Sequence, residues 1–172
     1  MRYLLLLAPL LLLSACATLS EDQCRAGNWY EIGKNDGADG RQSSFLAQHA
    51  KACRDYGIRP VASEWERGRR DGLPLYCVPS RAYHEGTRGK HLSPVCPVEQ
   101  LDQLERANAR GLAYNRITQE IGEIEREISS INAELARLEP GDPSRGALIS
   151  ERSRLRLDLL SLRTQRSRFR LY

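Results

Sequence analysis

Isoleucine and leucine recur at alternating spacings of four and three residues over the last third of the chain, in two series. The first series is Ile117, Ile121, Ile124, Ile128, Ile131, Leu135 and Leu138. The second series carries arginine at two positions and is Leu148, Arg152, Leu155, Leu159, Leu162, Arg166 and Phe169. This spacing puts each series on one face of a helix, as in the seam of a coiled coil. We therefore expect two amphipathic helices.

A segment rich in turn-forming residues separates the two series, at residues 139–144. Gly141 suits the turn after a helix, and the Asp-Pro pair that follows suits the start of the next one. Helices joined by so short a loop pack antiparallel. Residues 98–172 are thus predicted to form an antiparallel coiled-coil hairpin that turns near residues 140–143.

Charge supports this arrangement. Residues 98–139 hold nine acidic residues and five arginines, whereas residues 144–172 hold eight arginines and two acidic residues. Opposite arms attract, so we expect Arg152 and Arg166 to extend from the seam towards glutamates of the other helix. Folding about the turn pairs Leu135 with Leu148, Ile128 with Leu155, Ile121 with Leu162 and Tyr114 with Phe169. The arginine-rich arm also leaves open a contact with anionic lipid headgroups or with a partner protein.

The region from residue 24 to residue 97 has a different composition, with nine glycines and five prolines. Residues 28–37 align without gaps with residues 63–72, and both contain the pattern aromatic-Glu-x-Gly-[Lys/Arg]-x-Asp-Gly. A weaker third copy begins at Tyr83 and lacks the Asp-Gly pair. The repeat positions that define the motif are Tyr30, Gly33, Asp36, Gly37, Trp65, Gly68, Asp71, Gly72, Tyr83 and Gly86.

The repeat predicts short helices. Asn28 and Ser63 each stand three residues before a glutamate, which is the spacing of an N-cap, so we expect a helix to begin at each. The aromatic residue and the two glycines then share one face, where the glycines leave a notch for another backbone. The alternative is that each Asp-Gly forms a type I′ hairpin turn. A further helix is expected over residues 44–56, with a buried face formed by Phe45, Ala52 and Tyr56.

The first residues indicate export. Arg2 precedes an apolar run over residues 4–13, which is shorter than the roughly 20 residues that span a bilayer as a helix. The run ends in Leu13-Ser14-Ala15-Cys16, which resembles the bacterial lipobox, in which the cysteine receives a diacylglyceryl group. Residues 1–15 are thus predicted to be a lipoprotein signal peptide, and residues 16–23 a lipidated Cys16 with a short linker. The alternative is an ordinary secretory signal followed by a chance cysteine.

The residue after Cys16 indicates the membrane. Lipoproteins retained in the inner membrane of Gram-negative bacteria usually carry Asp at that position, and this chain has Ala17. We therefore expect a lipid anchor in the outer membrane, facing the periplasm.

The chain has five cysteines. With Cys16 lipidated, an even number remains in an exported chain, which predicts two disulfides among Cys24, Cys53, Cys77 and Cys96. Four cysteines allow three pairings; we favour Cys24–Cys53 with Cys77–Cys96 because short loops close most readily. A metal site is the alternative, for which His49 and Cys53 are the closest pair of ligands.

The repeat, the lipobox and the cysteines together resemble bacterial lipoproteins of the family known as domain of unknown function 2799. The resemblance also includes Tyr76-Cys77, Val95-Cys96-Pro97 and the helical tail. It departs from the family pattern in the third copy and near residues 107–111, where members often carry a further aromatic-Gly copy. The family has no established activity, so the resemblance implies an architecture and no mechanism.

Motifs for catalysis and cofactor binding are missing from the sequence. No serine lies in a G-x-S-x-G motif, no glycine loop leads into G-K-[ST], and residues 35–40 lack the alternating ligands of a calcium loop. Asp36 and Asp71 are expected to terminate helices, and His84 and His91 to be exposed. We therefore expect no catalytic residues, no cofactor, no metal and no nucleic-acid partner.

These observations predict a mainly α protein: a small, disulfide-stapled, Gly-rich helical domain over residues 24–97, followed by the helical hairpin over residues 98–172. The function we expect is that of a non-enzymatic envelope protein, anchored through Cys16, whose hairpin docks on another protein or on itself. An alternative is a cell-wall glycan-binding module that uses Trp29, Tyr30, Trp65 and Tyr83. A hydrolase is the third possibility and has the least support.

Overall fold

The computed structural model describes residues 17–170, and this range is helical with no strand. Seven α-helices follow one another, with 3-10 turns at Ser43–Phe45 and Arg54–Tyr56 on either side of the third. They are α1 (Glu21–Ala26), α2 (Trp29–Ala38), α3 (Leu46–Cys53), α4 (Ala62–Tyr76), α5 (Pro79–Thr87), α6 (Val98–Arg137) and α7 (Ser144–Ser167). The predicted mainly α fold class, with its stapled domain and its hairpin, is confirmed.

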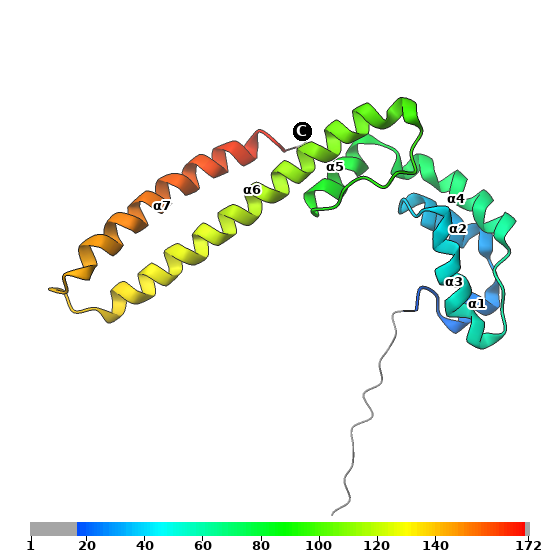
Figure 1. Cartoon of the computed structure of the whole chain (residues 1–172), viewed down its shortest axis with the longest axis horizontal. Helices are drawn as coiled ribbons and strands as arrows, with labels where there is room; N and C mark the ends of the chain where they lie inside the picture. Colours follow the sequence, from blue (N-terminus) through cyan, green and yellow to red (C-terminus); the bar gives the residue numbers. More distant parts are fainter. Residues whose placement is uncertain (1–16, 171–172) are drawn as a thin grey trace, which may run out of the picture.

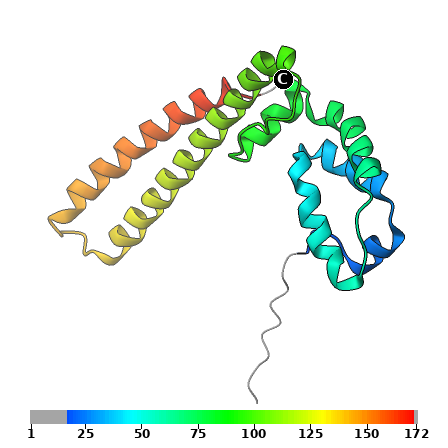
Figure 2. The same ribbon diagram turned by 45° about the vertical axis from the view of Figure 1, so that its right-hand side comes forward.

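The molecule is bent, with the short helices α1–α4 at one end and the long hairpin of α6 and α7 at the other (Figure 1). A second view shows the same two arms, with α5 lying along the first part of α6 (Figure 2). None of the helices in the described range is long and apolar enough to cross a membrane. The predicted signal peptide and Cys16 lie outside the described residues.

The first core lies among α1, α2, α3 and α4. Its buried members are Leu19, Cys24, Trp29, Cys53 and Trp65. Cys24 and Cys53 form a disulfide with a Cα–Cα distance of 5.5 Å. Leu19 is only 6% exposed, and the Ser20 side chain caps α1. The stretch expected as a linker is therefore folded onto the domain from about residue 18 onwards, because an apolar side chain and a helix cap anchor it.

The helix boundaries differ from the expected ones in three places. Asn28 does cap α2, but α4 begins at Ala62 after Val61, so Ser63 is not an N-cap. Asp71 lies inside α4 and terminates nothing, since the helix continues to Tyr76. The helix expected over residues 44–56 is α3 flanked by two 3-10 turns, and Tyr56 is 37% exposed. The buried face of α3 instead carries His49 and Cys53.

The second core joins the end of α4 to α5 and the first half of α6. It consists of Tyr76, Cys77, Ala82 and Leu104, with Cys77 and Cys96 in a disulfide whose Cα atoms lie 5.6 Å apart. The sequential cysteine pairing is thus confirmed. The boundary expected between residues 97 and 98 falls inside this packed unit, because α5 needs α6 to cover its buried face.

The hairpin has the predicted register. Ile121 and Leu162 belong to one buried cluster, and Ile128 and Leu148 pack against the next, which contains Leu135 and Leu155. α6 is continuous through Gly111, and its seam follows the heptad spacing. The two seam arginines do not reach glutamates. They lie beside uncharged partners: Arg152 donates to Asn132 Oδ1 at 2.8 Å, and the Arg166 guanidinium lies 5.8 Å from the Tyr114 ring centre. A flanking arginine supplies the ion pair between the arms instead, from Arg163 to Glu125 at 2.7 Å.

Candidate functional site

The repeat motif brings α2 and α4 into backbone contact. A Cβ atom built on Gly33 would overlap the Trp65 carbonyl, and one built on Gly68 would overlap the Tyr30 carbonyl. Gly37 and Gly72 meet the carbonyls of Arg69 and Lys34 in the same way. The four glycines of the two full copies therefore form one crossing, where each copy receives the backbone of the other. Any side chain at these positions would force the two helices apart.

The aromatic and acidic positions of the two copies are exchanged across this crossing. Trp65 Nε1 donates a hydrogen bond to Asp36 Oδ2 at 2.8 Å, and the Tyr30 hydroxyl donates to Asp71 Oδ2 at 2.9 Å. Each motif thus supplies the donor for the acidic residue of the other. The bond to Asp71 raises the pKa of Tyr30, because ionised Tyr30 loses its donor and faces a carboxylate. The motif is therefore explained first as a reciprocal helix-pairing device.

Asp36 also belongs to a hydrogen-bond chain that runs through His49 to Thr18. Its Oδ2 lies 2.8 Å from His49 Nε2, and His49 Nδ1 lies 2.9 Å from the Thr18 hydroxyl. In the tautomer that carries its proton on Nε2, His49 donates to Asp36 and its Nδ1 accepts from Thr18. Hydroxyl, imidazole and carboxylate then stand in the order of a nucleophilic triad. His49 is only 2% exposed, however, and Asp36 is shared with Trp65. The arrangement works as a clamp that ties the segment around Thr18 to the core.

A hollow of about 400 Å³ lies beside this clamp, lined by Ala17 and Thr18 together with residues of α3 and its following turn. Thr18, at one end of this hydrogen-bond chain, is partly exposed and lines the hollow.

An ion pair within α4, between Arg69 and Glu66, also supports the crossing of α2 and α4. Arg69 is 9% exposed and forms two hydrogen bonds to the Glu66 carboxylate, each at 2.8 Å. Its Nη1 also donates to the Arg41 carbonyl at 3.1 Å. The guanidinium holds the pKa of Glu66 below its usual range, and the carboxylate raises the pKa of Arg69 in turn. This pair fastens the loop after α2 to α4.

The third copy also has a partner, which lies in α6. A Cβ on Gly86 would overlap the Asn108 carbonyl of α6, and one on Gly111 would overlap the Tyr83 carbonyl of α5. Asn108 occupies the position of the aromatic residue and donates to the carbonyls of Ala82 and Lys90, each at 2.9 Å. α5 and α6 therefore cross as α2 and α4 do.

In the crossing of α5 and α6, as in that of α2 and α4, the aromatic position of one copy lies near the acidic position of the other. Six residues after Tyr83 and Asn108, where the full copies have Asp, the chain has Gly89 and Tyr114. Tyr83 contacts Tyr114 at a ring-centre distance of 6.5 Å, and Asn108 binds the Lys90 carbonyl next to Gly89. The fold thus contains two successive crossed pairs built from four copies of one motif.

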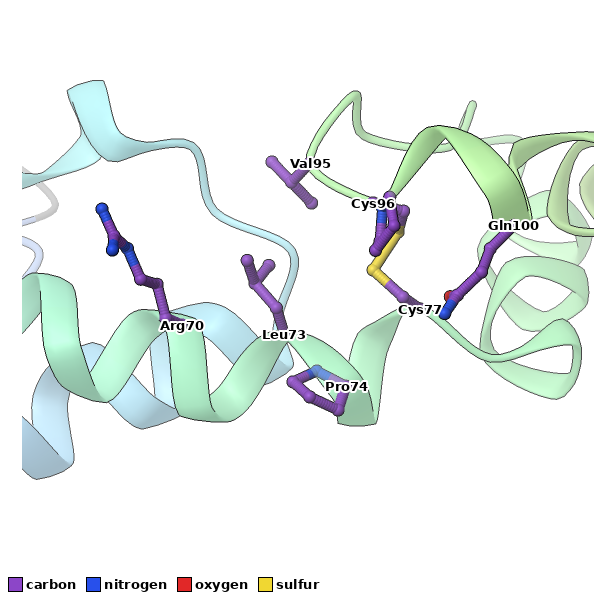
Figure 3. Close-up of a pocket in the computed structure, with 8 residues that line it drawn as sticks. Arg70, Leu73, Pro74, Cys77, Val95, Cys96 and Gln100 are labelled. Carbon is purple, nitrogen blue, oxygen red and sulfur yellow. A yellow bond between two sulfur atoms is a disulfide. The ribbon is translucent and has the colours of Figure 1, made fainter.

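An apolar pocket of about 430 Å³ opens at the end of α4, beside the second disulfide (Figure 3). Leu73 and Pro74 of α4 face Val95 across it, with the Cys77–Cys96 sulfurs at its wall. Arg70 and Gln100 supply the polar groups at its ends. It contains no titratable acid or base that suits proton transfer. Its walls suit a hydrophobic side chain or acyl segment.

The structure brings the predicted motif residues together in two places. Two of them, Tyr83 and Gly86, meet α6 at the crossing of α5 and α6. The other eight meet at the crossing of α2 and α4: Tyr30, Gly33, Asp36, Gly37, Trp65, Gly68, Asp71 and Gly72. Trp29, Trp65 and Tyr83 are at most 6% exposed, so they are packing residues and present no stacking surface. His84 and His91 are exposed and lie apart from the clamp.

Sequence analysis did not identify Thr18, and it treated residues 107–111 as a departure from the family pattern, whereas Asn108 and Gly111 act there as a further copy. Asn108 and Gly111 carry the motif spacing of three residues, but the missing aromatic hides the copy inside a long helix. The link from Asp36 to His49 has no local signal, because it joins a helix end to a separate helix 13 residues later. Within residues 17–170, no group of three or more metal-ligating side chains is found.

The fold and its motif define a disulfide-bonded, all-helical protein built on crossed helix pairs. The family model described as "Protein of unknown function (DUF2799)" matches residues 28–113, half of the chain. The chain belongs to this family. The match covers both crossed pairs and stops near the point where α6 enters the hairpin. No curated protein and no solved structure matches the chain.

Proposed function

We propose that this protein is an outer-membrane lipoprotein on the periplasmic side, anchored through Cys16, and that it is a structural, non-enzymatic component which associates through its hairpin. The occupant that we propose for the hairpin surface is a second copy of the chain. The observation that carries this proposal is the outward face of α7. That face carries no charged residue although the helix is rich in arginine.

The seam of α7 faces α6, and an opposite strip faces solvent. On this strip Ile149, Leu157 and Leu160 are 42%, 67% and 60% exposed. Ser153 lies between them and donates its hydroxyl proton to the Ile149 carbonyl at 2.8 Å, so the hydroxyl is satisfied within the helix. The residues that complete this strip are Gly146, Ser153, Thr164 and Ser167. Such a charge-free strip is expected where another surface covers the helix.

The other arm supplies the complementary charge. Glu120, Glu123, Glu127 and Glu134 lie along one flank of α6 at helical spacing, and all four are exposed. None of them forms an ion pair with another described residue. A second hairpin that lays its α7 strip beside this row would place Arg156 and Arg168, which flank the strip, next to unpaired glutamates. Charge complementarity thus favours a copy of this chain over an unrelated partner.

The anchor follows from the lipobox-like tetrad, and the fold adds one consequence. The folded domain begins at Thr18, which His49 holds, so Ala17 alone separates Cys16 from it. Two or three acyl chains on Cys16 would therefore hold the domain close against the membrane surface. The hairpin extends from the other end of the molecule (Figure 1).

The experiment is site-specific crosslinking in cells, with a photoreactive residue placed at Leu157 on the strip. Asp158, exposed on a different side of the same helix, is the matched control. We expect an adduct of twice the chain mass from position 157 and little from position 158. Equal yields at the two positions, or no adduct at either, would refute the docking surface. A discrete adduct with a different protein at position 157 alone would replace the second copy as its occupant.

A further inference from the structure

A polar pocket of about 310 Å³ lies between the two crossed pairs. The loop after α2 forms one wall, the end of α4 the floor, and α5 with the following loop the opposite wall. Direct contacts across this joint are few, and one of them is the ion pair from Arg81 to Asp39 at 3.1 Å. We propose that this pocket binds a phosphate group, carried by a soluble phosphomonoester or by a lipid headgroup.

The charge of the lining is the first argument. Four permanent cations face two carboxylates: Arg41, Arg81, Arg88 and Lys90 against Asp39 and Glu85. Glu85 is 6% exposed and is neutralised by Arg88 and by Arg81, whose Nε lies 3.3 Å away. Asp39 is neutralised by Arg81. Both acids are thus already paired, and the excess of positive charge belongs to the other two cations.

Those two cations stand on opposite walls. Arg41 belongs to the first crossed pair, and Lys90 belongs to the second. Neither forms an ion pair with a described residue; the Arg41 guanidinium lies 4.3 Å from the Phe45 ring centre, a contact that orients it without neutralising it. The oxygens of a phosphate between them would meet a bidentate guanidinium on one side and an ammonium on the other.

The neutral groups of the pocket point to the same ligand. The Tyr76 hydroxyl accepts a hydrogen bond from the Ser93 amide at 2.9 Å, and its own proton has no acceptor among the described residues. Tyr76 is 2% exposed, so this donor is held rigidly. The pocket therefore offers one unused hydroxyl donor beside its two unpaired cations, which suits the several acceptor oxygens of a phosphate.

The test is a calorimetric titration of the purified full chain at constant ionic strength. Glycerol 3-phosphate represents the soluble monoester, and vesicles of phosphatidylcholine with and without phosphatidylglycerol represent the headgroup. We expect saturable binding in at least one arm. The double variant Arg41→Gln/Lys90→Gln should weaken it by about tenfold or more, since it removes both unpaired charges. The arm that saturates identifies the source of the phosphate.

The control variant Arg126→Gln/Arg137→Gln removes the same charge from α6, away from the pocket, and should bind like the unmodified chain. Equal weakening by both double variants would show a general charge effect and would overturn the proposal. So would the absence of saturable binding in both arms. The Arg41 and Lys90 side chains hold no ion pair, so both variants should keep their helical circular dichroism and thermal midpoint. Phosphate binding in this titration does not depend on the lipid anchor or on association through the hairpin.

Discussion

At the scale of single residues, Asp36 has the most consequential environment in the described part of the chain. Its Oδ2 accepts from the indole of Trp65 and lies within hydrogen-bond distance of His49, and those two residues are 1% and 2% exposed. Asp71, at the equivalent position of the other copy, accepts only from the partly exposed Tyr30. The two motif carboxylates therefore occupy equivalent sites of very different burial.

This difference in burial predicts that substitution by alanine lowers the free energy of unfolding more at Asp36 than at Asp71. Asp36→Ala leaves two buried donors without an acceptor, and each unsatisfied buried group costs about 1–3 kcal/mol. We expect it to lower the free energy of unfolding by about 2–4 kcal/mol on that basis. Asp71→Ala exposes Tyr30 to water, which replaces the lost acceptor, so about 1 kcal/mol or less is expected. Urea denaturation followed by circular dichroism measures both.

The control is Asp36→Asn, which keeps an acceptor oxygen of the same size and should recover part of the loss. If Asp36→Ala and Asp71→Ala cost the same, the clamp through His49 contributes nothing to stability. That result would also remove the reason for holding the segment around Thr18 to the core.

At the scale of helices, the crossed pair depends on backbone contact rather than on side-chain interlocking. Each of the four glycines of the first crossing faces a carbonyl of the other helix, and a methyl group at any of them would overlap it. This explains why the motif spaces its glycines four residues apart, one turn along each helix. Two helical glycines of the long hairpin lie outside such crossings: Gly122 meets only the end of an arginine side chain, and nothing lies near Gly146 within 4 Å.

We expect opposite effects from alanine at two of these glycines. Gly68→Ala should abolish cooperative folding of the first unit, because its Cβ would overlap the Tyr30 carbonyl and α2 and α4 must separate. Gly146→Ala lies in α7 with open space around it, so it should stabilise the hairpin by about 0.5–1 kcal/mol through its helix propensity. Thermal unfolding by circular dichroism distinguishes the two. A Gly68→Ala variant that melts like the unmodified chain would contradict the crossing.

Much of this element scale was predictable from the sequence. The heptad series fixes the hairpin register, because a seam of period 3.5 has one solution for two helices joined by a short turn. The glycine spacing predicts close helix approach, and the four cysteines that remain beside Cys16 predict two disulfides. The partner of each glycine face was not predictable: α2 pairs with α4 and α5 with α6, and no local pattern encodes which faces meet. The fourth copy was hidden because Asn108 replaces the aromatic residue and works through its amide.

The seam arginines show a second limit of sequence reasoning. Opposite net charges of the arms correctly favour antiparallel pairing, but they do not determine individual pairs. Arg152 lies beside Asn132, and Arg166 lies over Tyr114, because side chains at seam positions reach the nearest residue on the other helix rather than the nearest opposite charge. Arg163 follows the seam residue Leu162 and lies at the edge of the seam, from where its guanidinium reaches Glu125.

At the scale of the whole molecule, the protein consists of three packed units in series and does not have one common core. The first crossed pair, the second crossed pair and the hairpin each have their own buried cluster, and α4 and α6 run from one unit into the next. Each disulfide closes one crossed-pair unit, and the hairpin has none. An anchor at Cys16 would act on the first unit, and the exposed strip of α7 lies on the last.

This order predicts what loss of the anchor does. Cys16→Ser removes the thiol that would carry the diacylglyceryl group, so labelled palmitate should no longer enter the protein and the chain should leave the membrane fraction. Ser20→Ala is the matched control four residues away: it removes the cap of α1 at a cost of about 1 kcal/mol and should leave labelling unchanged. Because no described helix can cross a membrane, a Cys16→Ser chain that is unlabelled but still sediments with membranes would mean that a second contact, such as the phosphate pocket or the α7 strip, holds it there. Labelling that persists in Cys16→Ser would refute the anchor itself.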